Sequence, residues 1–283
     1  MTCHRRLTAA AVLLLALAGG RPSRAQQAQN PSPMVEHTRA HPRLHEEIPA
    51  GRRVPLEIGT LFMPARLKLK GRVPLFVHFH GAQWIPEVAA ARVGLAAISA
   101  QLGSGSGAYA KPFADTQRFA RLIAEAEAKA GVTFGPIVLT SWSAGYGAVR
   151  EILTVPANYA RVDAVLLIDG MHTGYVGSSV IDPAGLQVFL QFARDAAAGR
   201  KRMLITHSEI FPGTYASTTE TADWLLAELG VPRKAVVRWG PMGTQQLSEA
   251  RSGRFRLLGF AGNSAPDHVD QLHALPELLK WLQ

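Results

Sequence analysis

Cysteine is almost absent from this 283-residue chain, which contains only Cys3, close to the N-terminus. A single thiol cannot form an intramolecular disulfide and cannot build a cysteine-based metal site. If the N-terminal segment is removed on export, no thiol remains, and a cysteine nucleophile is excluded as well. A chain without thiols suits an oxidising compartment such as the periplasm.

Runs of basic residues are also absent, although the formal net charge is +9. Four arginines fall within the first 25 residues, which hold no acid, so the remainder carries +5. Nucleic-acid binding surfaces combine a basic stripe with stacking aromatics, and the sequence has no such stripe. The charge therefore favours a solvated basic surface, and we expect no nucleic-acid partner.

The first 25 residues have the pattern of an export signal. His4–Arg6 is basic, and Leu7–Leu17 is an apolar run too short to span a bilayer as a free-standing helix. Ser23–Ala25 ends in small residues of the kind that precede cleavage, here in front of Gln26. We expect a periplasmic or secreted protein without stable membrane insertion after cleavage; an uncleaved membrane anchor is the alternative.

Residues 26–53 are polar and interrupted by proline, which predicts a flexible segment, and residues 54–283 suit a single domain. The sequence shows no repeats and no dinucleotide fingerprint. The glycine-rich run at 103–107 lacks the Lys-Ser/Thr ending of a phosphate loop, so we expect a mobile loop above the site. Tyr109 and Lys111, just after it, are expected at the surface or within reach of a substrate. No cofactor and no metal are expected.

Apolar runs alternate with amphipathic stretches throughout the expected domain. This alternation predicts an α/β fold, with a doubly wound, mostly parallel sheet flanked by helices. In such a sheet the carboxyl ends of the parallel strands meet at one edge, where ligands bind. The expected strands are Val54–Met63, Val73–Phe79, Leu95–Gln101, Ile137–Thr140, Val162–Asp169, Arg202–Thr206 and Phe255–Phe260. The expected helices are Pro86–Arg92, Asp115–Ala130, Leu186–Ala198 and Thr218–Leu229.

The stretch Pro136–Val149 indicates the chemistry. An apolar strand ends in Ser141-Trp142-Ser143-Ala144-Gly145, and a helix follows directly. A tight turn between strand and helix exposes its middle residue at the sheet edge. Here the chain resembles the α/β-hydrolase superfamily, and the resemblance implies that Ser143 is the nucleophile. Ser141 replaces the usual first glycine, and the alternative is an ordinary turn with Ser143 as a helix N-cap.

His80-Gly81-Ala82-Gln83-Trp84 follows the second expected strand. In the superfamily that this chain resembles, a His-Gly pair at this place opens the oxyanion loop. The resemblance implies that the amide of Ala82 or Gln83 acts with that of Ala144 to stabilise the negative charge of acyl transfer. Trp84 is then expected to wall the pocket, and the alternative is a glycine that simply ends a strand.

A base and an acid are expected after the nucleophile, in the superfamily's chain order. His268 is favoured as the base because it lies in the expected loop after the last strand; His273, expected on a helix surface, is the alternative. Asp169 is favoured as the acid because it directly ends an apolar strand. Glu209, after the next strand along the chain, remains open.

The substrate pocket is expected to include four aromatic or imidazole side chains, each with core packing as its alternative. They are Trp142, Tyr146, His172 and Tyr215. Together these patterns predict an exported serine hydrolase that cleaves a small-molecule carboxylic ester. A serine peptidase using the same groups and a catalytically silent binding protein of the same fold are the alternatives.

Overall fold

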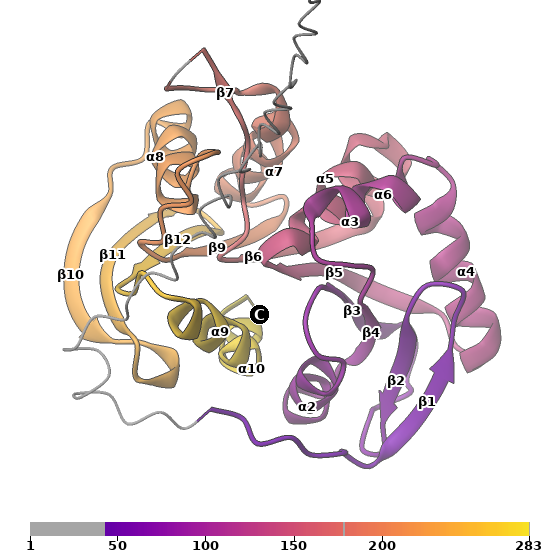
Figure 1. Ribbon diagram of the computed structural model, residues 1–283. Helices are drawn as coiled ribbons and strands as arrows, with labels where there is room; N and C mark the ends of the chain where they lie inside the picture. The colour runs from indigo at the N-terminus through magenta and orange to yellow at the C-terminus, as the bar shows by residue number, and fades with distance from the viewer. Residues whose placement is uncertain (1–42, 178, 283) are drawn as a thin grey trace, which may run out of the picture.

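The computed structural model describes residues 43–177 and 179–282. In this part of the chain a 10-stranded sheet runs through the molecule in the order β1-β2-β4-β3-β5-β6-β9-β12-β11-β10 (Figure 1). The strands from β4 to β12 in this order are parallel, and those beyond them at each edge are antiparallel. The expected doubly wound, mostly parallel sheet is confirmed.

The strands have these bounds: β1 Gly51–Pro55, β2 Thr60–Pro64, β3 Val73–Phe79, β4 Ala96–Ala100, β5 Phe134–Trp142, β6 Val162–Ile168, β9 Arg202–His207, β10 Lys234–Trp239, β11 Gln245–Ser252 and β12 Phe255–Phe260. A separate small hairpin consists of β7 (Tyr175–Val176) and β8 (Val180–Ile181). The central strands are apolar on both sides because helices cover both faces of the sheet.

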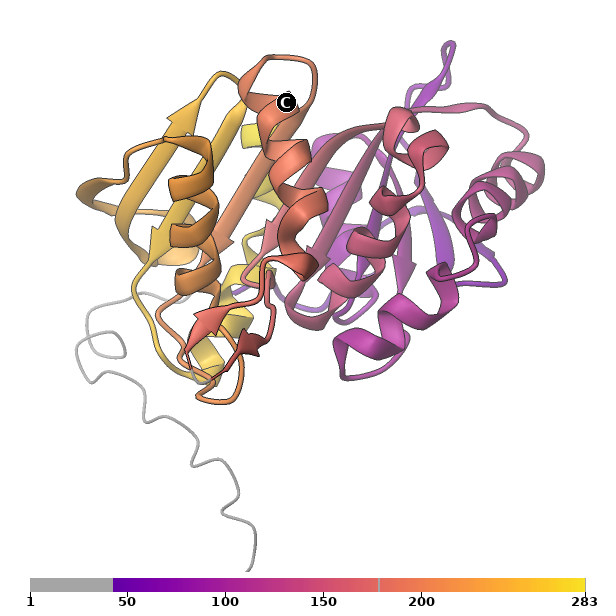
Figure 2. The same ribbon diagram turned by 90° about the horizontal axis from the view of Figure 1, so that it is seen from above.

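Helices pack on the two faces of the sheet and bury separate apolar clusters. One face carries α3 (Ser106–Phe113), α4 (Arg118–Ala130), α5 (Tyr146–Thr154), α7 (Gln187–Ala197) and α8 (Thr218–Leu229). The other carries α2 (Trp84–Val93), α9 (Ala265–His273) and α10 (Leu275–Leu282). The short α6 (Pro156–Arg161) joins α5 to β6. Figure 2 shows α5, α7 and α8 lying over the sheet.

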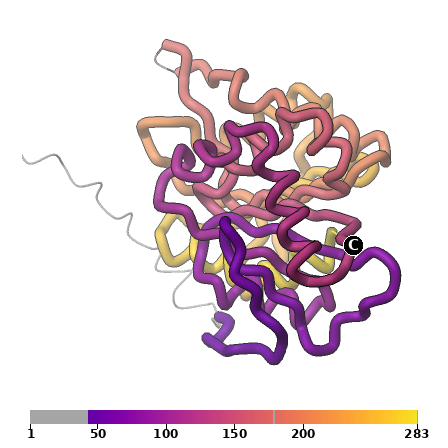
Figure 3. Tube along the Cα trace, turned by 90° about the vertical axis from the view of Figure 1, so that its right-hand side faces the viewer, coloured from indigo at the N-terminus to yellow at the C-terminus, as the bar shows by residue number. Residues whose placement is uncertain are grey.

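Two sequence-based expectations about strands are corrected. Val54–Met63 is not one strand, because Gly59 turns the chain with a φ of 77° and divides it into the β1–β2 hairpin at the edge nearest the viewer in Figure 3. Strands β10 and β11 had no expected counterpart. Most residues of β10 are exposed, so its apolar pattern is weak. It is a strand because it pairs with β11, which in turn pairs with β12.

The glycine-rich run also differs from the expected loop. Helix α3 begins within it at Ser106. Tyr109 is not a surface residue but is fully buried, and its hydroxyl donates to the carbonyl of Gly103 at 2.9 Å. These contacts tie the run to the domain.

The proposed export signal and most of the expected flexible segment lie outside the described residues. The sheet begins at Gly51 rather than at Val54, and Arg43 already contacts the domain through its Nε, 2.6 Å from the Asp270 carboxylate. Among residues 43–177 and 179–282, no helix combines the length and apolar character that crossing a membrane requires.

Candidate active site

Ser143 lies between the end of β5 and the start of α5, in a single 3₁₀ turn over Ser143–Gly145. Its backbone φ is 49°, in the left-handed region that non-glycine residues rarely adopt. Such a conformation costs on the order of 1–3 kcal/mol, so the surrounding packing must hold it. The turn therefore has the strained geometry that the sequence motif predicts.

Left-handed residues also follow the two strands that flank β5. His80, after β3, has a φ of 76°, and Asp169, after β6, has a φ of 43°. The register pairs Phe79 with Ser141, and Trp142 with Ile168. The three strained residues therefore lie side by side at one edge of the sheet, where parallel strands present ligand-binding groups.

Two glycines permit this close backbone packing. A Cβ on Gly145 would lie 2.2 Å from the carbonyl oxygen of Phe79. A Cβ on Gly170 would lie 2.3 Å from the carbonyl oxygen of Ser143 and 2.6 Å from its amide nitrogen. Because these neighbours are backbone atoms, no side-chain movement relieves the clash. Glycine is required at both positions for the turn to form.

The carboxylate of Asp169 is buried and lies 2.6 Å from Nδ1 of His268, which donates to it. It also accepts the backbone N–H of Ser208 at 2.8 Å and the hydroxyl of Thr218 at 2.9 Å. Burial by itself would raise the pKa of the Asp169 carboxyl. The hydrogen bond and charge of His268 and the Ser208 donors outweigh burial, so this pKa lies below its usual range.

Helix α9 holds His268 in place from several directions. A capping box between Ser264 and Asp267 fixes the start of the helix. The indole Nε1 of Trp142 donates to the carbonyl oxygen of His268 at 2.9 Å, and the hydroxyl of Thr206 donates to Gln271 at 2.6 Å. The imidazole orientation is therefore set by contacts with β5 and β9 as well as by Asp169. His268 lies within this helix, not in the loop expected before it.

The two alternatives for base and acid lie elsewhere. His273 also belongs to α9, but it is buried rather than on the helix surface and packs edge-on against Trp84, with ring centroids 5.6 Å apart. Glu209 is exposed, and its backbone N–H donates to the carbonyl of Gly262 at 2.9 Å. The structure brings neither side chain to Asp169 or His268.

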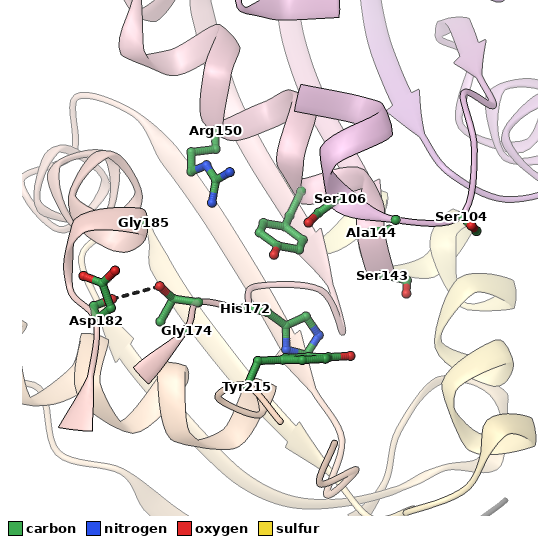
Figure 4. Close-up of a pocket in the computed structure, with 13 residues that line it drawn as sticks. Ser104, Ser106, Ser143, Ala144, Arg150, His172, Gly174, Asp182, Gly185 and Tyr215 are labelled. Carbon is green, nitrogen blue, oxygen red and sulfur yellow. Dashed lines mark hydrogen bonds between the residues drawn. The ribbon is translucent and has the colours of Figure 1, made fainter. Parts of the chain in front are cut away.

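Two cavities meet at Ser143, and His172 and Tyr215 line both of them. The large cavity, about 590 Å³, extends past Ala144 and Tyr146 to Arg150 (Figure 4). The small cavity, about 230 Å³, is lined by Asp169, Thr218 and His268. An ester seated on Ser143 therefore has separate space on each side of its scissile bond.

His172 has a defined protonation state at this junction. Its Nδ1 lies 2.9 Å from the carbonyl oxygen of Ala216, which can only accept, so Nδ1 carries the proton. Burial lowers the pKa of His172. The ring is therefore neutral at physiological pH and keeps Nε2 as an acceptor. Its edge-on contacts with Tyr146 and Tyr215 fix the ring plane.

The expected oxyanion donors are divided between the cavity wall and the adjacent loop. Ala144 lines the large cavity, whereas neither Ala82 nor Gln83 lines either cavity. Within the described residues, the backbone amides of Ala82 and Gln83 donate to no protein acceptor.

Two of the expected pocket residues have other positions. Trp84 lines neither cavity and packs against His273 and the apolar cluster beneath α2. The Trp142 ring stacks on that of His80 and lies tilted against that of His268, with ring centroids 5.0 and 4.5 Å away. Trp142 therefore packs against the His268 imidazole and lines neither cavity. Tyr146, His172 and Tyr215 line the large cavity.

No sequence pattern pointed to several of the groups found at the site. Ser208 and Thr218 donate to Asp169, and Arg150 lines the large cavity. Arg150 comes seven residues after Ser143, about two helical turns, and this spacing was the one indication that both lie on the same side of the helix. Within the described residues, no group of three or more His, Cys, Asp or Glu side chains has the arrangement of a metal site.

The sequence matches no protein-family model and no curated protein sequence. Solved structures are similar in fold. They include esterase 2 from Thermogutta terrifontis (TM-score 0.50, 18% identity, covering 83% of this chain and 95% of that chain). Acetyl xylan esterase from Aspergillus awamori is another (TM-score 0.48, 13% identity, covering 82% of this chain and 98% of that chain).

The strand order, the strained turn after β5 and the similarity to the Thermogutta esterase define an α/β-hydrolase fold. The solved structures named above are both esterases. At these identities the comparison shows the fold, and the chemistry rests on the site itself.

Proposed function

We propose that this chain is an exported serine hydrolase that cleaves a carboxylic ester through an acyl-enzyme intermediate. The observation that carries the proposal is the hydrogen-bonded Asp169–His268 pair, which lines a cavity together with the strained Ser143. A nucleophile, a base and an acid that orients the base are the groups that acyl transfer requires. The Thermogutta protein of similar fold, an esterase, favours an ester as the substrate.

In the first half-reaction the Ser143 hydroxyl oxygen attacks the ester carbonyl carbon, and its proton passes to Nε2 of His268. Asp169 accepts the Nδ1–H of His268, which leaves Nε2 as the basic nitrogen and stabilises the imidazolium. As the bond from the carbonyl carbon to the alcohol oxygen breaks, Nε2 returns the proton to that oxygen. The alcohol leaves, and the acyl group stays on Ser143.

In the second half-reaction water replaces the alcohol. His268 takes a proton from water, the hydroxyl oxygen bonds to the acyl carbon, and the Ser143 oxygen leaves and recovers the proton. One ester and one water become one acid and one alcohol. The amide of Ala144, with that of Ala82 or Gln83, stabilises the oxyanion, a role in which losing one donor costs about 10²–10³ in turnover.

A fluorophosphonate probe tests the proposal directly, because it reacts with an activated serine. We expect labelling at Ser143 in the wild type and none in Ser143→Ala. Hydrolysis of chromogenic esters should fall by several orders of magnitude in this variant, while circular dichroism shows an unchanged fold. Folded wild-type protein that neither labels nor hydrolyses any ester would favour a binding protein instead.

Export is part of the proposal and rests on the first 25 residues. The basic start, short apolar run and small residues before Gln26 predict removal by a signal peptidase. N-terminal sequencing of protein recovered from the periplasm or medium should begin at Gln26. Recovery of the full-length chain in the cytoplasm would contradict export without affecting the chemistry.

A further inference from the structure

Arg150 lies in the large cavity, the same cavity that holds Ser143. It projects from α5, and Figure 4 shows its guanidinium pointing into the cavity, across from Tyr215. Among the described residues, its only ion pair joins Nε to Glu151 Oε1 at 3.4 Å. Neither of its Nη atoms has a hydrogen-bond partner in that part of the chain, so this half of the guanidinium fork is available to a ligand.

The guanidinium lies within reach of a bound acyl chain. Ser143 and Arg150 are separated by roughly 10 Å along the helix axis, and long helical side chains lean towards the helix N-terminus. The Cζ of Arg150 accordingly lies over the Tyr146 ring, 5.7 Å from its centroid. A Cβ on Gly185 would lie 3.4 Å from Nη1 of Arg150, so the absence of a side chain there leaves space beside the guanidinium.

The two cavities differ in which part of an ester they suit. His268 must return its proton to the leaving alcohol oxygen, and His268 lines the small cavity, so the alcohol belongs on that side. The Ala144 end of the turn opens into the large cavity. The acyl chain therefore extends through the large cavity, towards Arg150.

The Arg150 guanidinium can pair with an anionic group on that chain. A guanidinium fork matches the two oxygens of a carboxylate. Asp182 is the acidic side chain in the cavity wall, but its Oδ1 accepts the N–H of Ala184 at 2.9 Å. No ion pair within 4.0 Å joins Asp182 to Arg150, and Glu151 contacts the guanidinium through Nε, so among the described residues both Nη atoms stay free to donate to a substrate carboxylate.

We propose that Arg150 binds a carboxylate at the far end of the acyl chain. The substrates are then monoesters of dicarboxylic acids, with the free carboxylate on Arg150 and the ester carbonyl at Ser143. This inference rests on the proposed function, since it names the substrate class of the same site.

The test compares 4-nitrophenyl monoesters of succinic, glutaric and adipic acid with 4-nitrophenyl esters of uncharged acyl chains of equal length. The background rate is measured in Ser143→Ala and subtracted. At the best chain length, Arg150→Gln should lower the ratio of kcat/KM for charged over uncharged ester by about tenfold or more. Arg150→Lys should keep part of the preference, because it retains charge without the fork.

Two controls address the general charge of the protein. Arg194→Gln removes one charge from an exposed arginine on α7 and should leave the ratio unchanged. High salt should lower the ratio in the wild type, because it screens the ion pair with the substrate. A ratio that Arg150→Gln leaves unmoved at every chain length overturns the proposal.

Calorimetric titration with glutarate or adipate separates the two proposals. Ester hydrolysis with a charged-over-uncharged ratio that does not depend on Arg150 would contradict the carboxylate subsite and leave the esterase in place. The wild type could instead bind the dicarboxylate, and Arg150→Gln fail to bind it, in protein that hydrolyses no ester. That result would support the carboxylate subsite and contradict the esterase proposal.

Discussion

The Asp169 carboxylate accepts a 2.6 Å hydrogen bond from Nδ1 of His268, although 99 positions separate the two residues in the sequence. Asp169 directly follows the strand next to the one that leads to Ser143, whereas His268 comes from the other end of the domain. Because Nδ1 of His268 donates to Asp169, Nε2 is the basic nitrogen of the ring, and Asp169 is the carboxylate next to the imidazole. In the proposed reaction, turnover depends on this contact and on the backbone around Ser143.

Replacing Asp169 and Glu209 in turn should show which of the two carboxylates orients His268. Asp169→Asn removes the charge while keeping the shape, and in a comparable triad such a change costs about 10⁴ in turnover. Glu209→Gln should cost tenfold or less, because Glu209 is exposed and does not contact His268. Both are measured near pH 8, where an ordinary histidine is neutral. The reverse ranking would move the acid role to Glu209.

Adding one methyl group at Gly170 should disable the site. In Gly170→Ala the new Cβ would meet the backbone of Ser143 at 2.3 Å and displace it. A shift of about 1 Å in a reacting group can cost 10²-fold, so we expect at least that loss of ester turnover. Gly107→Ala is the matched control, since Gly107 is exposed on α3, lines neither cavity, and has no atom within 4 Å of the place its methyl group would take. Normal turnover in Gly170→Ala would mean that Ser143 is not held as described.

The hydroxyl of Ser141 should be dispensable. It is fully buried and has no hydrogen-bond partner among the described residues, so Ser141→Ala removes a polar group without breaking a bond. Turnover and urea midpoint should stay near wild type, and Ser141→Gly should also keep most activity. Thr140→Val is the contrasting variant, because the Thr140 hydroxyl is hydrogen-bonded to His78 Nδ1 at 2.8 Å. Losing this hydroxyl should lower the free energy of unfolding by about 1–3 kcal/mol. Collapse of activity in Ser141→Ala would give Ser141 a role in the reaction.

Acid should destabilise the fold through two buried histidines. Burial lowers the pKa of His78 to about 4, and burial with the Arg233 charge lowers the pKa of His207 to about 4. The unfolded chain, with histidine pKa values near 6.5, takes up these protons first. The stability that they contribute is complete above pH 6.5 and is lost as the pH falls towards 4, by up to about 1.4 kcal/mol per pH unit for each histidine.

Urea unfolding at several pH values between 7.5 and 4.5 measures this slope. His207→Asn should make it shallower, because one of the histidines that take up a proton on unfolding is gone. The Asp169 carboxyl contributes at lower pH, since its folded pKa is depressed below the ordinary value near 3.9. Stability that stays constant from pH 7 to pH 5 would contradict the neutral, buried state of both histidines.

The sequence determined the elements whose signals are local. The apolar runs of β3 and β12 and the pattern of α8 have the expected bounds, because a buried strand or amphipathic helix shows its burial in neighbouring residues. The turn after β5 is local as well, since small residues on both sides of Ser143 permit its left-handed backbone.

Tertiary structure alone decided the contacts between distant segments. Asp169 and Glu209 both follow strands, and only the position of α9 brings His268 to Asp169. Trp142 supports His268 instead of walling the pocket, and Arg150 lines the cavity, because packing decides which face of each element meets a partner. A sequence records the spacing of side chains along an element, whereas the neighbour of each face depends on how the whole sheet and its helices assemble.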